Sequence, residues 1–301
     1  MTRTALFSTS AAAIAIFTVA AGAEPARYAS PFDAVEAVGS ALRSGSRDEI
    51  LTIFGPESED LVYSGNRAED LANRLRLLDL YRQGFRLVPE DEGSYTLSLG
   101  AEDWPFPIPI ARAGDGWSFD MEAGAAELAA REIGANELDV IDLLDAYVDV
   151  QAEFRLADRD GDGVMEFARY IISSAEDRDG LFWADAESPL GVRIAQASLD
   201  GYADADGDQP PIPLSGYYFR LLDGQGPSAP GGAMSYVVNG NMVAGHAMLA
   251  VPAIPGETGV MSFLVSENGQ ILQADLGADT LAIAEGITVY DPDATWTPVD
   301  D

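Results

Sequence analysis

The hydrophobic pattern of this chain changes from a helical to a strand period twice, and this double change limits the folds open to it. Within residues 30–120, apolar residues first recur at helical spacing and then in short alternating runs. The same order repeats within residues 121–301, where a long helical stretch from Met121 to about Ala157 precedes strand-like runs. Helices followed by a sheet, twice in succession, predict an α+β fold. We therefore expect two domains, an N-terminal α+β domain over 30–120 and a helical segment leading into an antiparallel β domain over 121–301.

The third strand-like run of the first domain contains an alternation of prolines, Pro105, Pro107 and Pro109. Proline cannot donate a ladder hydrogen bond, so this run is expected to be an edge strand or an irregular ledge.

The order of helices and then sheet in this domain resembles the nuclear-transport-factor-like cone. That resemblance implies a cone-shaped cavity, in which a small molecule would bind or react if polar groups converge there.

The second domain carries two strong hairpin signals. Asn239-Gly240 and Asn268-Gly269 each lie between apolar runs, as in two-residue hairpin turns. We predict an antiparallel meander whose last strand covers residues 287–291, and a short helix near Met165–Ile172.

His246 is the only histidine of the chain, and the alternating pattern around it predicts a surface or half-buried strand position.

The N-terminal residues 1–23 have the pattern of a secretory signal peptide. Arg3 provides the positive start, Ala5 to Ala20 are largely apolar, and small residues lead to a cleavage point after Ala23. The alternative is a retained membrane anchor. A membrane-spanning helix requires about 20 apolar residues, and the apolar run from Ala5 to Ala20 is shorter than that. We expect a periplasmic protein with no membrane span after signal cleavage.

The chain carries a formal net charge of −33 and contains no cysteine. Neither a nucleic acid nor an anionic membrane surface is expected as a partner, because both require a basic face. Disulfides, thiol catalysis and thiolate metal sites are excluded. The partner class that remains open is another protein of the cell envelope, bound through exposed strand edges or the proline ledge.

The stretch DRDGDGVMEF, which begins at Asp158, has the spacing of the first half of an EF-hand calcium loop. Asp158, Asp160 and Asp162 occupy positions 1, 3 and 5, the carbonyl of Val164 occupies position 7, and Glu166 occupies position 9. These five residues are the predicted metal ligands, and Ca²⁺ is the predicted ion, with a structural role.

Position 12 of this loop is an arginine, Arg169, where an EF-hand has a bidentate carboxylate. Either Glu166 completes the ligand shell, or a more distant acid does so, namely Glu176, Asp177 or Asp179. The alternative to a metal site is a solvated acidic loop that holds no ion. A second acidic stretch, residues 204–208, has no apolar or acidic continuation and is interpreted as a linker.

Two resemblances extend these expectations. The blocks WPFPIPIARAGDGWSFD, REIGANELDVIDLLDAYVDVQAEF and GYYFRLLDGQGPSAPGGAMSYVVNGNMVAGHAMLAVPAIPGETGVMSFLVSENGQI resemble domain-of-unknown-function family 2950, a bacterial family of exported proteins. From Asn136 onward, a long helix, an acidic loop and closing strands resemble the globular part of type IV pilins and pseudopilins. The membrane helix that pilins use for filament assembly is missing here, so a pilus subunit is not expected.

No catalytic motif for nucleophilic, phosphate-binding or dinucleotide chemistry occurs in the sequence, and no catalytic residue is assigned. We expect an exported cell-envelope protein, a non-enzymatic binding or assembly protein with a structural calcium site. The alternative is a small-molecule binder or enzyme that uses a cone-shaped pocket in residues 30–120. A filled cone favours the first function, and a deep pocket with convergent polar groups favours the second.

Overall fold

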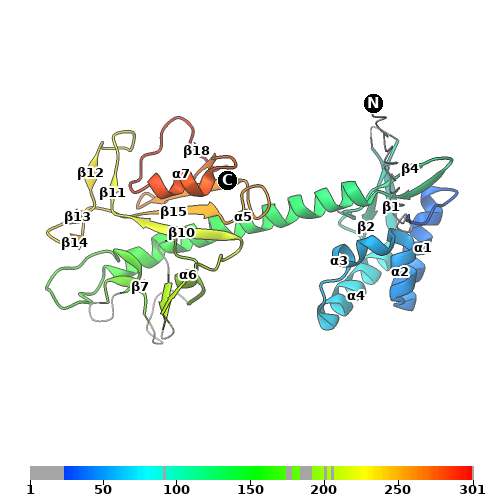
Figure 1. Ribbon diagram of the computed structural model, residues 1–301, viewed down its shortest axis with the longest axis horizontal. Coiled ribbons are helices and arrows are strands. Elements are labelled where there is room, and N and C mark those ends of the chain that lie inside the picture. Colours follow the sequence, from blue (N-terminus) through cyan, green and yellow to red (C-terminus); the bar gives the residue numbers. More distant parts are fainter. Residues whose placement is uncertain are drawn as a thin grey trace, which may run out of the picture. The chain divides into compact units, whose positions relative to one another are not determined.

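The computed structural model describes residues 24–90, 93–173, 178–183, 192–199, 202–204 and 207–299 (Figure 1). The chain divides into two compact units, with the boundary between Glu127 and Leu128. Each unit contains helices and an antiparallel sheet, so the predicted α+β class is confirmed. The predicted signal peptide lies outside the described residues.

In the first unit, helices precede a sheet. Three of the helices begin at side-chain caps. Ser30 accepts from the N–H of Asp33, Ser46 accepts from that of Glu49, and Asn66 accepts from those of Ala68 and Glu69. The helices are α1 (Pro31–Ser44), α2 (Arg47–Phe54), the 3₁₀ turn η1 (Pro56–Ser58), α3 (Glu59–Val62) and α4 (Arg67–Gln83). The strands are β1 (Phe85–Pro89), β2 (Tyr95–Leu99), β3 (Trp104–Pro105), β4 (Ile110–Ala113) and β5 (Gly116–Phe119).

The proline run of this unit forms the predicted irregular ledge. The sheet has the order β1-β2-β4-β5, and β3 lies off this path, paired with β2 at two positions only. Phe106, Ile108 and Ile110 are buried, so the prolines that alternate with them point away from the core.

Apolar side chains fill the space between the helices and the sheet of this unit. The ring centroid of Phe54 lies 4.8 Å from that of Phe119 and 6.3 Å from that of Phe106. Among the described residues of the unit, the buried polar side chains are two serines, Ser58 and Ser98. The interior therefore has the character of a packed core.

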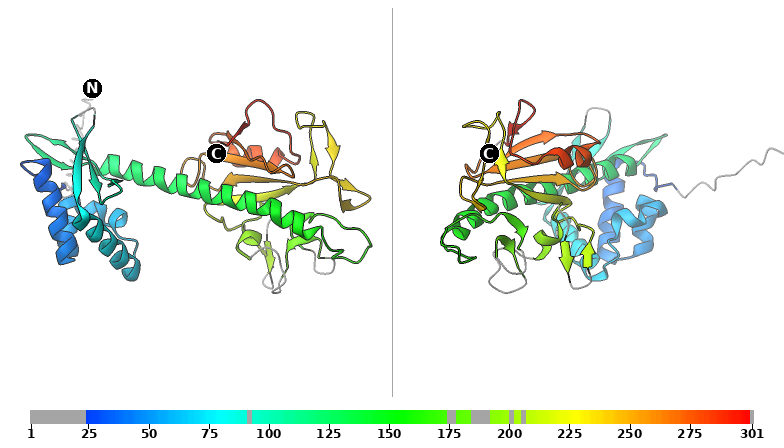
Figure 2. Two further views of the ribbon diagram at one scale, coloured as in Figure 1. Left: turned by 180° about the vertical axis from the view of Figure 1, so that it is seen from behind. Right: turned by 60° about the vertical axis from the view of Figure 1, so that its left-hand side comes forward.

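The second unit is built around α5 (Met121–Phe154), which begins in the first unit, and a five-stranded antiparallel sheet (Figure 2). The sheet order is β10 (Tyr217–Leu222), β15 (Ala247–Pro252), β16 (Met261–Ser266), β17 (Leu272–Asp275) and β18 (Thr297–Pro298). Residues of α5 such as Leu144 and Tyr147 pack with one face of the sheet, and α7 (Thr280–Gly286) packs with the other through Ala284. Because both faces are covered, every residue of β15 is buried.

Shorter elements surround this sheet. They are β6 (Tyr170–Ile172), β7 (Gly180–Phe182), α6 (Val192–Gln196), β8 (Tyr202–Asp204), β9 (Gly207–Gln209), β11 (Gly224–Gln225), β12 (Met234–Ser235), β13 (Val237–Val238) and β14 (Asn241–Met242). The hairpin turn at Asn239-Gly240 is confirmed, with φ of 54° and 102° at its two residues, as a type I′ turn requires. Asn268-Gly269 lies in a longer connection between β16 and β17.

Several local predictions for the second unit are wrong. The helix expected near Met165–Ile172 is replaced by β6, because side-chain and strand contacts hold this backbone extended. Residues 287–291 form no strand beyond an isolated bridge of Tyr290 with Gln225, and α7 precedes them. The stretch 204–208, interpreted as a linker, contributes to the paired strands β8 and β9, although residues 205 and 206 lie outside the described part.

The described residues contain no helix that is both long and apolar enough to cross a bilayer.

Candidate functional site

The acidic loop follows the end of α5 and brings three predicted ligands together. One carboxylate oxygen from each of Asp158, Asp160 and Asp162 lies within 4.8 Å of the other two, and all three side chains are exposed. Gly161 and Gly163 have φ of 82° and 90°, a backbone conformation that glycine adopts without strain. The loop therefore gathers carboxylates around one point.

Backbone N–H groups orient these carboxylates. Asp158 accepts from the N–H of Gly161 at 2.7 Å and from that of Gly163 at 2.9 Å. These bonds, that of Gly161 first, lower the pKa of the Asp158 carboxyl below its ordinary value. Asp160 accepts from the N–H of Asp162 at 3.1 Å, and Asp162 accepts from the N–H of Val164 at 2.7 Å. Hydrogen bonds within the loop thus hold all three side chains in place.

The loop is also attached to the β13–β14 hairpin. The side-chain amide of Asn241 donates to the carboxylate of Asp162, and the N–H of Met242 donates to Glu166 Oε2 at 2.8 Å. The N–H of Phe167 donates to the carbonyl of Met242 at 2.8 Å. Residues about eighty positions apart in the sequence thus meet at this loop.

Glu166 is partly buried at this junction. Burial, more than any other cause, raises the pKa of its carboxyl. The negative charges of Asp160, Asp162 and Asp179 add to the rise, and the hydrogen bond from Met242 opposes it. The surroundings of this fourth predicted carboxylate ligand, mainly its burial, therefore disfavour the charged form.

The other predicted participants have different positions. Val164 is exposed, and its N–H is used within the loop. Arg169, at position 12 of the loop, pairs with Asp223, with 3.9 Å between its Nη2 and Asp223 Oδ2. Its guanidinium carbon lies over the ring of Tyr170, 5.2 Å from the ring centroid. Asp179 contributes charge near Glu166, and its carbonyl accepts from the N–H of Arg169. Glu176 and Asp177 lie outside the described residues.

The donor set fits a hard divalent cation. Carboxylate and carbonyl oxygens are the ligands that Ca²⁺ prefers, and glycine at the sixth position permits the turn. Asp158, Asp160 and Asp162 would hold the ion, with the carbonyl of Val164 and the carboxylate of Glu166 as the remaining predicted ligands. The ion would neutralise carboxylates that otherwise repel one another.

His246 belongs to a buried polar network. The prediction of a surface or half-buried strand position is wrong, because the residue is 1% exposed and precedes β15. Its Nδ1 lies 3.0 Å from the hydroxyl of Tyr147, which also accepts from Gln151 Nε2 at 3.3 Å. Burial, together with the positive charge of Arg155, lowers the pKa of His246 to about 4. A single histidine among apolar residues offered no signal of this network.

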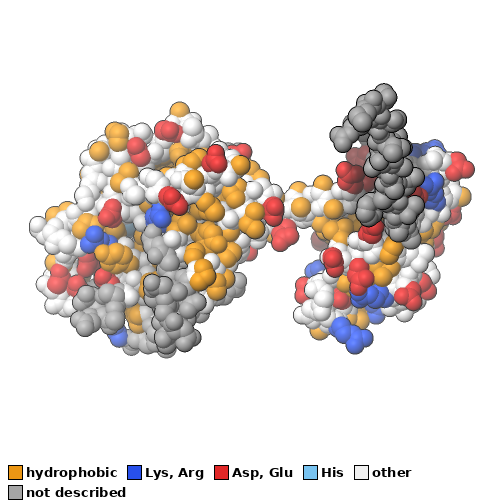
Figure 3. Space-filling view, in the orientation of Figure 1, with side chains coloured by type: hydrophobic (Ala, Val, Ile, Leu, Met, Phe, Trp, Pro, Cys, Tyr) orange, Lys and Arg blue, Asp and Glu red, His pale blue; other side chains and the backbone are white. Residues whose placement is uncertain are grey.

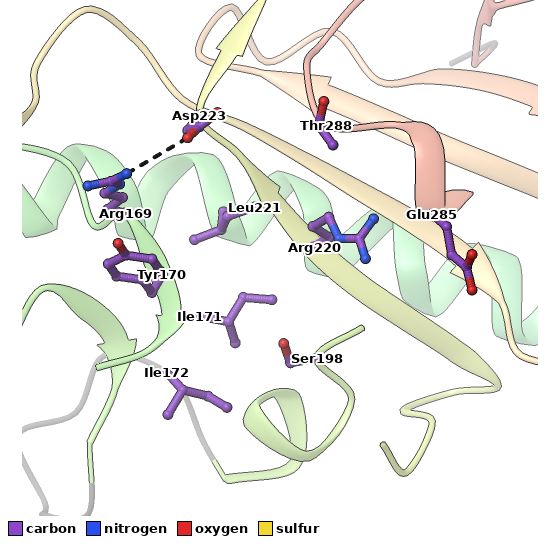
Figure 4. Close-up of a pocket in the computed structure, with 10 residues that line it drawn as sticks. All are labelled: Arg169, Tyr170, Ile171, Ile172, Ser198, Arg220, Leu221, Asp223, Glu285 and Thr288. Carbon is purple, nitrogen blue, oxygen red and sulfur yellow. Dashed lines mark ion pairs between the residues drawn. The ribbon is translucent and has the colours of Figure 1, made fainter. Parts of the chain in front are cut away.

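A cavity of about 530 Å³ lies beside β10 (Figure 4). Arg169 and Tyr170, from the segment that follows the acidic loop, form one side of it, and Arg220 and Leu221 of β10 form another. The remaining lining residues are Ile171, Ile172, Ser198, Asp223, Glu285 and Thr288. Sequence reasoning missed this site, because its walls come from four separate segments.

Acidic side chains are spread over the face of the molecule drawn in Figure 3, among apolar and neutral polar ones.

A family model described as "Protein of unknown function (DUF2950)" matches residues 26–299. No curated protein and no solved structure matches the chain. The resemblances to pilins and to the nuclear-transport-factor-like cone therefore stay predictions.

Proposed function

Since the chain belongs to DUF2950, a family of unknown function, we propose its role from its own residues. It is an exported, non-enzymatic protein of the cell envelope that binds or assembles with another protein, and a structural Ca²⁺ in the acidic loop stabilises its second unit. The observation that carries this proposal is the attachment of the loop to α5 on one side and to the β13–β14 hairpin on the other.

The proposed ion acts as a clamp between these elements. Arg159 Nε donates to the carbonyl of Phe154, the last residue of α5, at 3.2 Å, so the loop starts from a fixed helix end. At its other end, Asp162 and Glu166 contact Asn241 and Met242. An ion held by carboxylates from both ends of the loop removes their repulsion and stabilises both attachments. Extracellular calcium modules work with dissociation constants of roughly 10⁻⁴–10⁻³ M, so a weak exposed site is sufficient.

Two observations favour binding over catalysis. His246 is buried, and its pKa of about 4 keeps it neutral at ordinary pH, which is typical of a core residue. The interior of the first unit is packed with aromatic and aliphatic side chains at the place where the alternative function needs a polar pocket. The proposed contact surfaces are therefore on the outside of the units.

The calcium part of the proposal is tested by thermal unfolding of the mature chain, residues 24–301, in chelator and in excess Ca²⁺. The expected result is a higher Tm in Ca²⁺ for the wild type and no calcium-induced rise for Asp160→Ala. Asp145→Ala is the matched control, because it removes one exposed carboxylate from α5, away from the loop. Identical melting curves of the wild type in both buffers would contradict the calcium part of the proposal.

The export and assembly parts have their own test. Cell fractionation with sequencing of the mature N-terminus is expected to place the chain in the periplasmic fraction, starting at Glu24. Pull-down from envelope extracts is expected to recover the same partner in repeated preparations, more of it in Ca²⁺ than in chelator. Recovery in the cytoplasmic fraction of a chain that still carries residues 1–23 would contradict export.

A further inference from the structure

Strand β10 is an edge strand of its sheet, and part of its outer side faces the cavity. On that side, Phe219 donates its N–H to the carbonyl of Ala197 at 2.9 Å and accepts from the N–H of Leu199 at 2.8 Å. The register of β10 with β15 is unbroken from Tyr217 to Leu222, so peptide groups two residues apart point to the same side. The N–H and C=O groups of Leu221 therefore point toward the outer side, where the cavity lies.

The cavity extends around this strand edge from one face of the sheet to the other. Successive side chains of a strand point to opposite faces, and both Arg220 and Leu221 line the cavity. Arg220 Nη1 donates to the carbonyl of Ala284 at 2.8 Å, on the face that α7 covers. Leu221 packs against the core cluster on the face that α5 covers. A molecule in the cavity would thus contact both faces and the edge between them.

We propose that this cavity binds a short extended peptide, which adds to the outer side of β10 at Leu221 as a further strand. Main-chain hydrogen bonds provide affinity in such strand addition, and pockets for alternate side chains provide specificity. The volume of about 530 Å³ lies within the roughly 300–1,000 Å³ typical of ligand sites. The inference deepens the proposed binding role, and it rests on that role because it identifies the chemistry of the partner.

The two faces differ in chemistry, and this difference predicts the peptide's sequence pattern. On the α5 face, Ile171, Ile172 and Leu221 offer aliphatic contact to an apolar side chain. On the α7 face, Arg220 and Glu285 offer charges of both signs. The peptide therefore alternates apolar with charged or polar residues, which is the pattern of a strand that lies across both faces.

The ends of the cavity favour a ligand that carries both donors and acceptors. Arg169 pairs with Asp223 at one end, 3.9 Å apart, which is the dashed contact of Figure 4. Arg220 and Glu285 lie toward the other end of the view. A simple anion would meet a carboxylate at each end of the cavity, Asp223 at one and Glu285 at the other. A peptide has backbone donors and acceptors and mixed side chains, so it can bond to the arginines and to the carboxylates.

The test is selection of an mRNA-displayed library of random hexapeptides on the full mature chain in Ca²⁺, with Leu221→Pro as the counter-selection target. Proline at 221 removes the outward N–H and leaves the hydrogen bonds between β10 and β15, because those come from the alternate residues. Circular dichroism and the melting temperature check that this variant is folded. We expect enriched peptides that alternate apolar and polar residues and bind the variant about tenfold more weakly than the wild type.

A second control resides in the ligand and does not depend on the variant's folding. An enriched peptide with N-methyl groups on alternate backbone nitrogens keeps its side chains but loses its donors on one side, and we expect about tenfold weaker binding to the wild type. The inference is overturned if no sequence is enriched, or if the N-methylated peptides bind as well as their parents. Calcium-dependent melting of the same preparation tests the proposed calcium role separately, so the two failures are distinguishable.

Discussion

The side chain of Gln151 makes both backbone hydrogen bonds that Ala168 has to offer. Its Nε2 donates to the carbonyl of Ala168 at 2.9 Å, and its Oε1 accepts from the N–H of Ala168 at 2.9 Å. A neighbouring strand would supply the same pair of bonds, but here a helix residue with 0% exposure supplies it. Through this contact α5 holds the segment that leads from the acidic loop to the cavity wall.

Gln151→Leu should therefore destabilise the second unit strongly. The substitution leaves the buried N–H and C=O of Ala168 without these partners, and each unsatisfied group costs about 1–3 kcal/mol. We expect a loss of about 2–4 kcal/mol in the free energy of unfolding, together with faster amide hydrogen exchange at Ala168. Gln270→Leu, at an exposed position between β16 and β17, is the control and should change stability by about 0.5 kcal/mol or less. Unchanged exchange at Ala168 would show that the contact is not needed.

His246 should make the chain less stable as the pH falls. Its folded pKa is about 4 and its ordinary value is 6.5, so the unfolded chain binds the proton more readily. The stability that this difference provides is present above about pH 6.5 and is lost as the pH falls toward about 4. Between about pH 7 and pH 5 the loss should be about 2 kcal/mol.

The measurement is urea unfolding of the wild type and of His246→Gln at both pH values. Carboxylates titrate in both proteins, so only the difference between their pH dependences reports on the histidine. His246→Gln should be less stable than the wild type at about pH 7 and should lose less stability on acidification. Parallel pH dependences in the two proteins would contradict the assignment of a depressed pKa.

Glu166→Gln should affect the melting temperature differently in chelator and in Ca²⁺. Glutamine keeps an oxygen that can accept from the N–H of Met242, and it removes one of the mutually repelling charges. In chelator, the Tm of the variant should equal or exceed that of the wild type. In Ca²⁺, its calcium-induced rise should be smaller than that of the wild type, because one of the proposed ligand carboxylates is lost. A full calcium-induced rise in the variant would remove Glu166 from the ligand set.

Local pattern predicted much of this structure, because spacing along the chain determines a helix or a turn directly. The long α5, the turn at Asn239-Gly240 and the grouping of Asp158 with Asp160 and Asp162 all follow from spacing along the chain. Contacts between distant segments had no such signal.

The missed features all depend on such distant contacts. Gln151 holds Ala168 extended where local spacing favoured a helix. Both faces of β15 are covered, which buries His246 beside it where alternation predicted a strand position near the surface. The attachment of the acidic loop to Asn241 also depends on tertiary packing, which the spacing of aspartates does not encode.

The buried ring of Tyr217 packs directly against the backbone of Gly259. A Cβ at position 259 would lie 2.0 Å from the hydroxyl oxygen of Tyr217. The ring cannot shift freely, because that hydroxyl donates to the carbonyl of Met261 at 2.7 Å. Glu137 Oε1 accepts from the N–H groups of Val260 and Met261 at 2.8 and 2.9 Å, which holds the glycine's own neighbours against α5.

Gly259→Ala should therefore destabilise the second unit by about 1–3 kcal/mol, the usual cost of overpacking a core. Gly134→Ala is the matched comparison, since position 134 lies in α5 and a Cβ there meets no atom within 4 Å among the described residues. In a helix interior, alanine is favoured over glycine by about 1 kcal/mol, so this substitution should be stabilising. Chemical denaturation of both variants measures the two shifts. Equal shifts in one direction would mean that the Tyr217 hydroxyl yields to the added methyl group, and that the anchoring of the β15–β16 connection to α5 is looser than these hydrogen bonds indicate.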